Sequence, residues 1–298
     1  MNKENNKTGI LLVGHGSRLK YNKELVTEVA RKYALTMPDY NVEVGFMELV
    51  EPSIPQSFNK LKETGVNKII VNPVFLAHGM HTKIDIPTIL GLGPLVDLEN
   101  HPHHHHNHNH EHHHHHHRDA KSEPVEFDGE IIYLEPLGAD DKIVDIITDR
   151  INNELEKNPT NPPENTGILL IGHGSTLPYN NEVIESIAKK YISQNKDYPI
   201  EVGFMQLSKP TILESFDKLK EKGVKKVIAC PIFLAHGIHT KLDIPHSLGL
   251  NPEPIKSYPK NYDNIDVVEF DGEIILTEPI DANDSIIDII SERINPHL

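Results

Sequence analysis

The chain repeats itself, and this internal repeat constrains the fold more than any other feature. The segment Leu-Ala-His-Gly-Met-His-Thr-Lys at residues 76–83 returns as Leu-Ala-His-Gly-Ile-His-Thr-Lys at residues 234–241, a constant 158 positions later. A second cassette, Gly-His-Gly-Ser, occupies residues 14–17 and returns at residues 172–175 with the same offset. Because each half carries the same motifs in the same order, we expect two copies of one domain in tandem.

A histidine-rich segment is the main difference in length between the two copies. Residues 101–117 hold 13 of the 21 histidines, and the second half has no counterpart, so later motifs repeat after 143 positions instead of 158. Residues 158–165 are rich in Pro and Asn, as expected of an extended linker. We therefore predict a first domain at residues 1–157 with the insertion at 101–117, the linker at 158–165, and a second domain at 166–298.

Within each half, apolar runs alternate with helical periodicity. In the first half, residues 9–13, 41–46 and 68–75 are typical of buried strands, and apolar residues at helical spacing follow them. A fourth strand is expected at 131–134, before a closing helix at 140–155. This alternation predicts β-α-β units with right-handed crossovers. The expected fold class is α/β: two tandem doubly wound domains, each with a mainly parallel sheet flanked by helices.

Composition excludes several classes of protein. The formal net charge of −15 argues against nucleic acid as a partner, because phosphate binding needs a basic surface. The single cysteine, Cys230, rules out an intramolecular disulfide, fits a reducing compartment, and is expected in the core. The sequence has no signal peptide and no run of about 20 apolar residues, so we expect a cytoplasmic protein that does not associate with membranes.

The histidine cassettes follow predicted strands, and ligands of such sheets bind beyond the carboxyl ends of the strands. His15 and His81 are therefore expected on one rim, and His173 and His239 on the other copy's rim. Imidazoles without thiolates are too few for a closed structural zinc site, and favour an open, weakly held divalent ion. The alternatives are a phosphate-type glycine loop and histidines satisfied by backbone carbonyls. Sequence does not choose between His78 and His81 as the ligand.

The histidine-rich segment, residues 101–117, should bind Ni²⁺, Co²⁺, Zn²⁺ or Cu²⁺ at neutral pH. Its internal position and interspersed Asn107, Asn109 and Glu111 argue against an affinity tag. We interpret it as a metal store or delivery arm that is dispensable for chemistry, because the second copy lacks it.

These motifs, with Glu-Pro-Ser-Ile-Pro at residues 51–55 and Glu-Pro-Leu-Gly-Ala-Asp-Asp at residues 135–141, resemble the small archaeal sirohydrochlorin cobaltochelatases. Those class II chelatases also serve as the nickelochelatase of the methanogen nickel-tetrapyrrole pathway. The resemblance covers both halves, and short members of the family are homodimers of one such domain. It implies two fused chelatase-like domains that insert Co²⁺ and/or Ni²⁺ into sirohydrochlorin, for cobalamin or nickel-tetrapyrrole synthesis, with release of two pyrrole protons.

The resemblance also implies roles for individual residues. His15 and His173 match the family's proton acceptor and metal ligand, and His81 and His239 match its second metal ligand. The implied substrate-binding residues lie in the repeated loops and before the proline of the Glu-Pro motif: Glu51, Leu76, Ala77, His78, Gly79, Met80, His81, Lys209, Leu234, Ala235, His236, Gly237, Ile238 and His239.

The expected partners are sirohydrochlorin and a divalent metal ion. No tightly bound cofactor is expected, since Co²⁺ or Ni²⁺ is a substrate. The sequence leaves open which metal is physiological, whether the halves share one tetrapyrrole cleft, and whether the fused pseudo-dimer is a monomer or assembles further. The alternative functions are nickel or cobalt storage or delivery, and a ferrochelatase acting on sirohydrochlorin or protoporphyrin.

The two copies differ close to these motifs, which predicts that the sites have specialised and that one is dominant. Arg18 is replaced by Thr176, Glu48 by Gln206, and Glu51 by Lys209. The first copy keeps the pattern of the short chelatases more closely.

Overall fold

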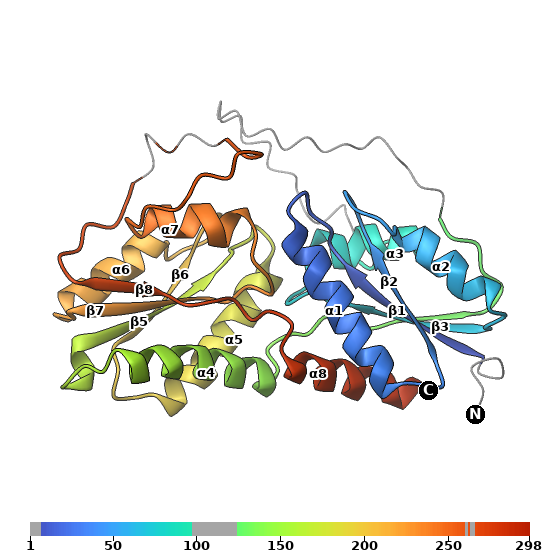
Figure 1. Ribbon diagram of the computed structural model, residues 1–298, viewed down its shortest axis with the longest axis horizontal. Helices are drawn as coiled ribbons and strands as arrows, with labels where there is room; N and C mark the ends of the chain where they lie inside the picture. The colour runs from blue at the N-terminus through green and yellow to red at the C-terminus, as the bar shows by residue number, and fades with distance from the viewer. Residues whose placement is uncertain (1–6, 97–123, 260–261, 263–265) are drawn as a thin grey trace.

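The computed structural model describes residues 7–96, 124–259, 262 and 266–298; the histidine-rich segment lies outside these described residues. The described chain forms two four-stranded sheets, each flanked by helices (Figure 1). All strand pairs in both sheets are parallel. The expected α/β class with two doubly wound domains is confirmed.

The two halves contain the same elements in the same order. The first half contains β1 (Thr8–Gly14), α1 (Lys20–Thr36), β2 (Asn41–Phe46), α2 (Ile54–Glu63), β3 (Lys68–Pro73), α3 (Ile86–Ile89), β4 (Glu130–Tyr133) and α4 (Asp141–Lys157). The second half contains β5 (Thr166–Gly172), α5 (Pro178–Gln194), β6 (Ile200–Phe204), α6 (Ile212–Glu221), β7 (Lys226–Pro231), α7 (Ile244–Ser247), β8 (Glu273–Leu276) and α8 (Asp284–Ile294). The strand orders, β2-β1-β3-β4 and β6-β5-β7-β8, place the strands before the two histidine loops side by side at the centre of each sheet.

Strand β1 shows why its sequence is apolar without alternation. Ile10 and Leu12 belong to one core cluster, whereas Leu11 and Val13 belong to another. Successive side chains of a strand point to opposite faces, so both faces of this strand are covered. The strand is therefore held rigidly between two cores, and its carboxyl end is a fixed platform for the Gly-His-Gly-Ser loop.

The last helix of each half lies on the sheet of the other half. Helix α4 packs against β7 and α5, whereas α8 packs against β3 and α1. Figure 1 shows α4 beneath the second-half sheet and α8 beneath the first-half sheet. One core cluster accordingly contains residues of both halves, with Ile143 from α4 and Ile286 from α8 fully buried in it. Helical periodicity predicts both helices, but it does not say which sheet each helix covers.

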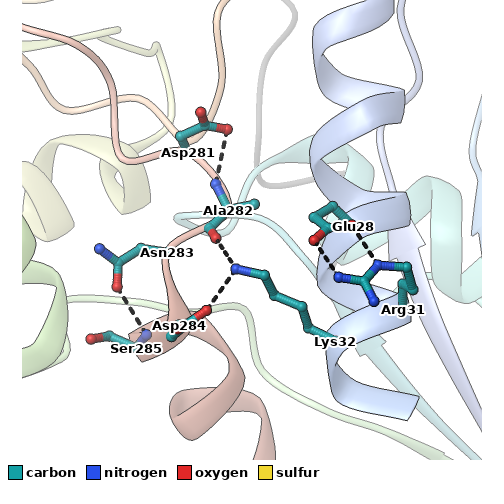
Figure 2. Close-up of polar contacts among 8 residues, drawn as sticks. All are labelled: Glu28, Arg31, Lys32, Asp281, Ala282, Asn283, Asp284 and Ser285. Atoms are coloured by element: carbon teal, nitrogen blue, oxygen red, sulfur yellow. Dashed lines mark hydrogen bonds and ion pairs between the residues drawn. The ribbon is translucent and has the colours of Figure 1, made fainter. Parts of the chain in front are cut away.

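We call α4 and α8 the exchanged helices, because each packs on the half of the chain to which it does not belong in sequence. Equivalent polar contacts hold each of them there. Lys32 on α1 donates to the carbonyl oxygen of Ala282 at 3.0 Å and to Asp284 at 2.6 Å (Figure 2). Lys190 on α5 makes the same two contacts, with Ala139 at 2.7 Å and Asp141 at 2.6 Å. Each lysine therefore fixes the start of the helix that arrives from the opposite half.

A helix cap at Ser53 and the expected burial of Cys230 complete the description of the fold. Ser53 caps α2 in a capping box with Gln56: the Ser53 hydroxyl accepts from the Gln56 N–H, and the Gln56 side chain accepts from the Ser53 N–H at 2.7 Å. Cys230 lies buried in β7, where burial raises the pKa of its thiol to about 11 and makes it unreactive. None of the described helices has the length and apolarity that a membrane span requires.

Candidate functional site

The polar residues of the candidate site stand at four neighbouring strand ends. In the first half, His15 follows β1, Glu48 follows β2, His78 and His81 follow β3, and Glu135 follows β4. Parallel strands end at the same edge of a sheet, so these side chains share one rim. The second half supplies the corresponding residues His173, Gln206, His236, His239 and Glu278.

At the centre of each rim two imidazoles meet. The ring centroids of His15 and His81 are 4.7 Å apart, and the rings are nearly perpendicular. The rings of His173 and His239 are 5.0 Å apart in a similar arrangement. The structure therefore brings together the residues that sequence placed on one rim, and a single ion could contact both rings. Their role as metal ligands remains a prediction.

The hydrogen bonds of these rings fix which nitrogen is available. Nδ1 of His15 lies 2.6 Å from the Gly16 carbonyl oxygen, and Nδ1 of His81 lies 2.7 Å from a carboxylate oxygen of Asp85. Both partners accept, so each Nδ1 carries the proton and each neutral ring keeps a lone pair on Nε2. A carboxylate behind a histidine in this way orients the ring and makes it a better metal ligand. The second half repeats both bonds, at 2.7 Å each.

The backbone forms a π-turn over His81–Asp85, and this turn brings the Asp85 carboxylate next to the His81 ring. The Ile86 N–H donates to the His81 carbonyl, a wider spacing than in an α-helix. Buried Thr82 stabilises the loop before it, because its hydroxyl accepts from the Gly79 N–H at 2.9 Å. The sequence does not predict this turn, although the Asp-Ile-Pro that follows each loop marks the position of the aspartate.

Gly16 allows the loop after β1 to touch the loop after β2. Its φ is +88°, and a side chain there would place Cβ 1.8 Å from the carbonyl oxygen of Glu48. The Glu48 N–H donates to the His15 carbonyl at 3.1 Å. The same approach occurs between Gly174 and Gln206. The loop after β2 therefore joins the site in each half, with a different side chain in each.

His78 belongs to a separate cluster on the same rim. Its Nε2 contacts a carboxylate oxygen of Glu135, and its Nδ1 lies 3.2 Å from the Thr82 hydroxyl. It is therefore His81, and not His78, that faces His15. Sequence reasoning left this choice open, and it assigned no role to Glu135, although the Glu-Pro that follows β4 was visible.

We call His15 and His173 the inner histidines of the two sites and His81 and His239 the outer ones. Burial is the main influence on the pKa of the inner histidines. Burial lowers the pKa of His15, and the adjacent His81 lowers it further, while Glu48 and Asp85 oppose the shift. Burial likewise lowers the pKa of His173, with His239 adding to the shift. Both rings are thus held in the neutral form at neutral pH, the form that binds a metal ion and accepts a proton.

The two sites differ in what approaches the inner histidine. A Glu48 carboxylate oxygen lies 3.6 Å from Nδ1 of His15, on the side away from the free lone pair. The Gln206 amide nitrogen instead lies 3.3 Å from Nε2 of His173. An amide N–H there can donate to the lone pair that a metal ion would need. Among the described residues, Nε2 of His15 has no hydrogen-bond partner, whereas Nε2 of His173 has the Gln206 amide.

The carboxylates that contact His81 and His239 also differ between the two sites. The side chain of Asp85 is 46% exposed, whereas that of Asp243 is only 10% exposed. The Tyr262 hydroxyl donates to Asp243 at 2.6 Å, on the oxygen not used by His239. The acceptor behind His239 is therefore shared, which weakens the negative charge available to that histidine.

The other predicted substrate-binding residues take varied positions. Leu76 lies in the core and its carbonyl accepts from the Gly138 N–H at 2.8 Å, whereas Met80 is 40% exposed. Glu51 accepts from the Ser53 N–H at 3.2 Å, and Lys209 pairs with Glu214 at 2.8 Å. The remaining loop residues are half-buried: Ala77, Gly79, Leu234, Ala235, Gly237 and Ile238. Among the described residues, no group of three or more His, Cys, Asp or Glu could hold a metal ion.

The arrangement of elements defines the class of protein. The fold is similar to that of SirB from Bacillus subtilis solved with Fe³⁺, with a TM-score of 0.67 and 20% identity over 97% of this chain and 95% of that chain. It is also similar to a CbiX structure described as the terminal enzyme of siroheme biosynthesis in denitrifying bacteria, with a TM-score of 0.61 and 17% identity over 97% and 99% of the chains. At these identities the likeness establishes the tandem chelatase-type fold.

The family follows from the sequence of both halves. The CbiX family model matches residues 9–154 and again residues 167–297, so the chain belongs to the CbiX family and carries two CbiX domains. One half is 55% identical over 147 residues to the sirohydrochlorin cobaltochelatase of Methanopyrus kandleri, a match covering 49% of this chain and 96% of the relative. A match to that of Methanocaldococcus jannaschii has 59% identity over 141 residues, covering 47% and 95%. These relatives have the length of one half.

Proposed function

We propose that the chain is a sirohydrochlorin chelatase that inserts Co²⁺ or Ni²⁺ into the tetrapyrrole. The observation that carries the proposal is the paired imidazoles, His15 with His81 and His173 with His239, whose Nδ1 atoms are engaged. The relatives named sirohydrochlorin cobaltochelatase support the choice of substrate. Two ligands leave a divalent ion open to exchange, as an ion that is a substrate requires.

The chemistry needs a weak metal ligand and a base at the same place. A divalent ion enters the macrocycle, and the two pyrrole N–H protons leave. A neutral imidazole with a lowered pKa can hold the ion through Nε2 and, once the ion has moved to the macrocycle, accept the two protons on the same atom in turn, releasing the first to water before it takes the second. We assign the proton-accepting role to His15 and His173, whose pKa values burial lowers, and ion delivery to His81 and His239.

The two sites should not contribute equally. In the first site no hydrogen bond from the described part of the chain reaches Nε2 of His15, and Glu48 lies near Nδ1; in the second the Gln206 amide contacts Nε2 of His173. We therefore propose that the first site carries most of the activity.

The direct test is an absorption assay with each tetrapyrrole and each metal. Sirohydrochlorin with Co²⁺ or Ni²⁺ should give the spectrum of the metallated product at a rate that depends on enzyme concentration. Faster insertion of Fe²⁺, or insertion into protoporphyrin only, would replace the proposal with a ferrochelatase.

A storage or delivery function is the second candidate, motivated by the histidine-rich segment at residues 101–117. Deleting this segment separates the two functions. A chelatase should keep its insertion rate at saturating metal, whereas a storage protein should lose most of its metal-binding capacity and have no insertion rate to keep.

A further inference from the structure

Each half places a tyrosine against the histidine loop of the other half. Tyr179, at the start of α5 in the second half, lies edge-on to His78 of the first half, with ring centroids 6.0 Å apart. The ammonium group of Lys83, from the same first-half loop, lies 5.9 Å from the centre of the Tyr179 ring. The ring thus contacts one residue on each side of His81.

The contact is reciprocal. Tyr21, at the start of α1 in the first half, lies 5.7 Å from the ring of His236 in the second half. Lys241 lies over the Tyr21 ring at 5.9 Å. Two occurrences with the same partners and nearly the same distances indicate a feature of the architecture, rather than an accident of one loop.

The space beside this contact is also built by both halves. A cavity of about 330 Å³ opens there, and residues of both halves line it. The lining includes Ala77, His78 and Glu135 from the first half, and Tyr179, Glu182 and Arg293 from the second. The Arg293 guanidinium donates to the Leu137 carbonyl at 2.8 Å, so the exchanged helix α8 holds the other wall.

We propose that Tyr179 and Tyr21 are positioning residues that act across the two halves: Tyr179 completes the site of His15 and His81, and Tyr21 completes that of His173 and His239. This inference rests on the proposed chelatase function. Each tyrosine ring packs on the loop that carries the outer histidine and restricts its movement. The side chain of that histidine is 40% exposed in His81 and 39% in His239, and within the described residues its hydrogen-bond partner is Asp85 or Asp243.

The test uses full-length chains in which only one site is active. The His173→Ala chain reports on the first site, and the His15→Ala chain on the second. Tyr179→Leu should slow Co²⁺ insertion by the His173→Ala chain about fivefold, the size expected for one aromatic contact. It should leave the His15→Ala chain unchanged. Tyr21→Leu should show the opposite pattern.

Two controls separate positioning from loss of folding. Tyr179→Phe keeps the ring and should restore the rate to within about twofold, because the contact uses the ring and not the hydroxyl. Thermal unfolding should show the same midpoint for the Tyr179→Leu and Tyr179→Phe chains, within a few degrees. A loss in the His15→Ala chain, an equal loss in both chains, or no loss in either would overturn the inference.

A second readout does not depend on activity. The ring proton resonances of His78, identified by their disappearance in His78→Gln, should shift in Tyr179→Leu and stay in place in Tyr21→Leu. Unshifted resonances would overturn the inference even for a fully active enzyme. If the parent chain inserts no metal while these resonances shift as expected, the chelatase proposal fails and the cross-half contact stands.

Discussion

The two histidine sites have nearly the same backbone and different chemistry at the inner histidine, which is His15 in the first half and His173 in the second. In both sites Nδ1 of the inner histidine contacts the carbonyl oxygen of the glycine that follows it, at 2.6 Å for His15 and 2.7 Å for His173. The neighbouring loop brings a carboxylate near Nδ1 of one and an amide to Nε2 of the other. The comparison teaches that duplication preserved the positions of the histidines, while a single exchange, Glu48 against Gln206, changed what can reach the lone pair.

The largest effect should come from removing the inner histidines one at a time. We expect His15→Ala to slow Co²⁺ insertion by about 10- to 100-fold, at the low end for loss of an acid–base group because the second site still works. His173→Ala should slow it by less than about twofold. Initial rates measured at saturating sirohydrochlorin check both values; equal losses would show that the sites have not specialised.

The exchanged helices allow a comparison of the two sheets. Ile143→Ala on α4 and Ile286→Ala on α8 empty equivalent, fully buried positions, and each should cost about 2–5 kcal/mol of unfolding free energy. Denaturant unfolding measures the cost, and amide hydrogen exchange locates it.

The location is the sharper part of this prediction. Because α4 covers the second sheet, Ile143→Ala should increase exchange in β7 more than in β3, and Ile286→Ala should do the reverse. Faster exchange within the helix's own half of the sequence would contradict the exchanged arrangement.

Exchanging Glu48 and Gln206 for each other's residue type should move the pKa values of His15 and His173 in opposite directions. The Glu48 carboxylate raises the pKa of His15 against the stronger effect of burial, so Glu48→Gln should lower that pKa further. Gln206→Glu should raise the pKa of His173, which now lacks this charge. In the metal-free protein, NMR titration of the histidine rings measures both changes.

The same substitutions predict the acidic limb of the activity profile. Insertion requires neutral imidazole, so the rate falls as pH drops through the pKa of the inner histidine. In the His173→Ala chain, Glu48→Gln should therefore shift this fall to lower pH. A shift to higher pH would mean that the carboxylate does not act through charge.

The smallest effect should come from the lysines that hold the exchanged helices. Lys32→Ala and Lys190→Ala each remove one surface ion pair and one bond to a carbonyl, and each should lower the melting temperature by only a few degrees. The two values should match, because the contacts match. A much larger loss for one lysine would show that the two junctions are not equivalent.

The sequence was most informative where a pattern has a local cause. The run at residues 9–13 is apolar throughout because both faces of β1 are buried, and Ser53 caps α2 through its own hydroxyl. The meeting of His15 with His81 follows from a general rule of parallel sheets, because both residues lie at the carboxyl ends of adjacent parallel strands. The strand and the pairing of the two histidines are therefore visible in the sequence alone.

What could not be predicted depends on contacts between distant segments. The apolar face of α4 is the same whether it covers its own sheet or the other, so periodicity cannot reveal the exchange. His78 and His81 have equal chemistry, and only the π-turn and Glu135 direct them to different partners. The sequence gives no sign of the role of Tyr179, because its partner, His78, is about a hundred residues away, in the other copy.

The exchange of α4 and α8 has a consequence for how such a chain could arise. A half made separately would lack the helix that covers its own sheet, and would have to borrow it from a second copy. In the fused chain the exchange of helices is intramolecular. It therefore depends on the effective concentration of one half near the other and not on the protein concentration. Cutting the peptide between α4 and β5 should accordingly leave two fragments that stay together. Freed from pairing with an identical copy, each half could then change its own sequence.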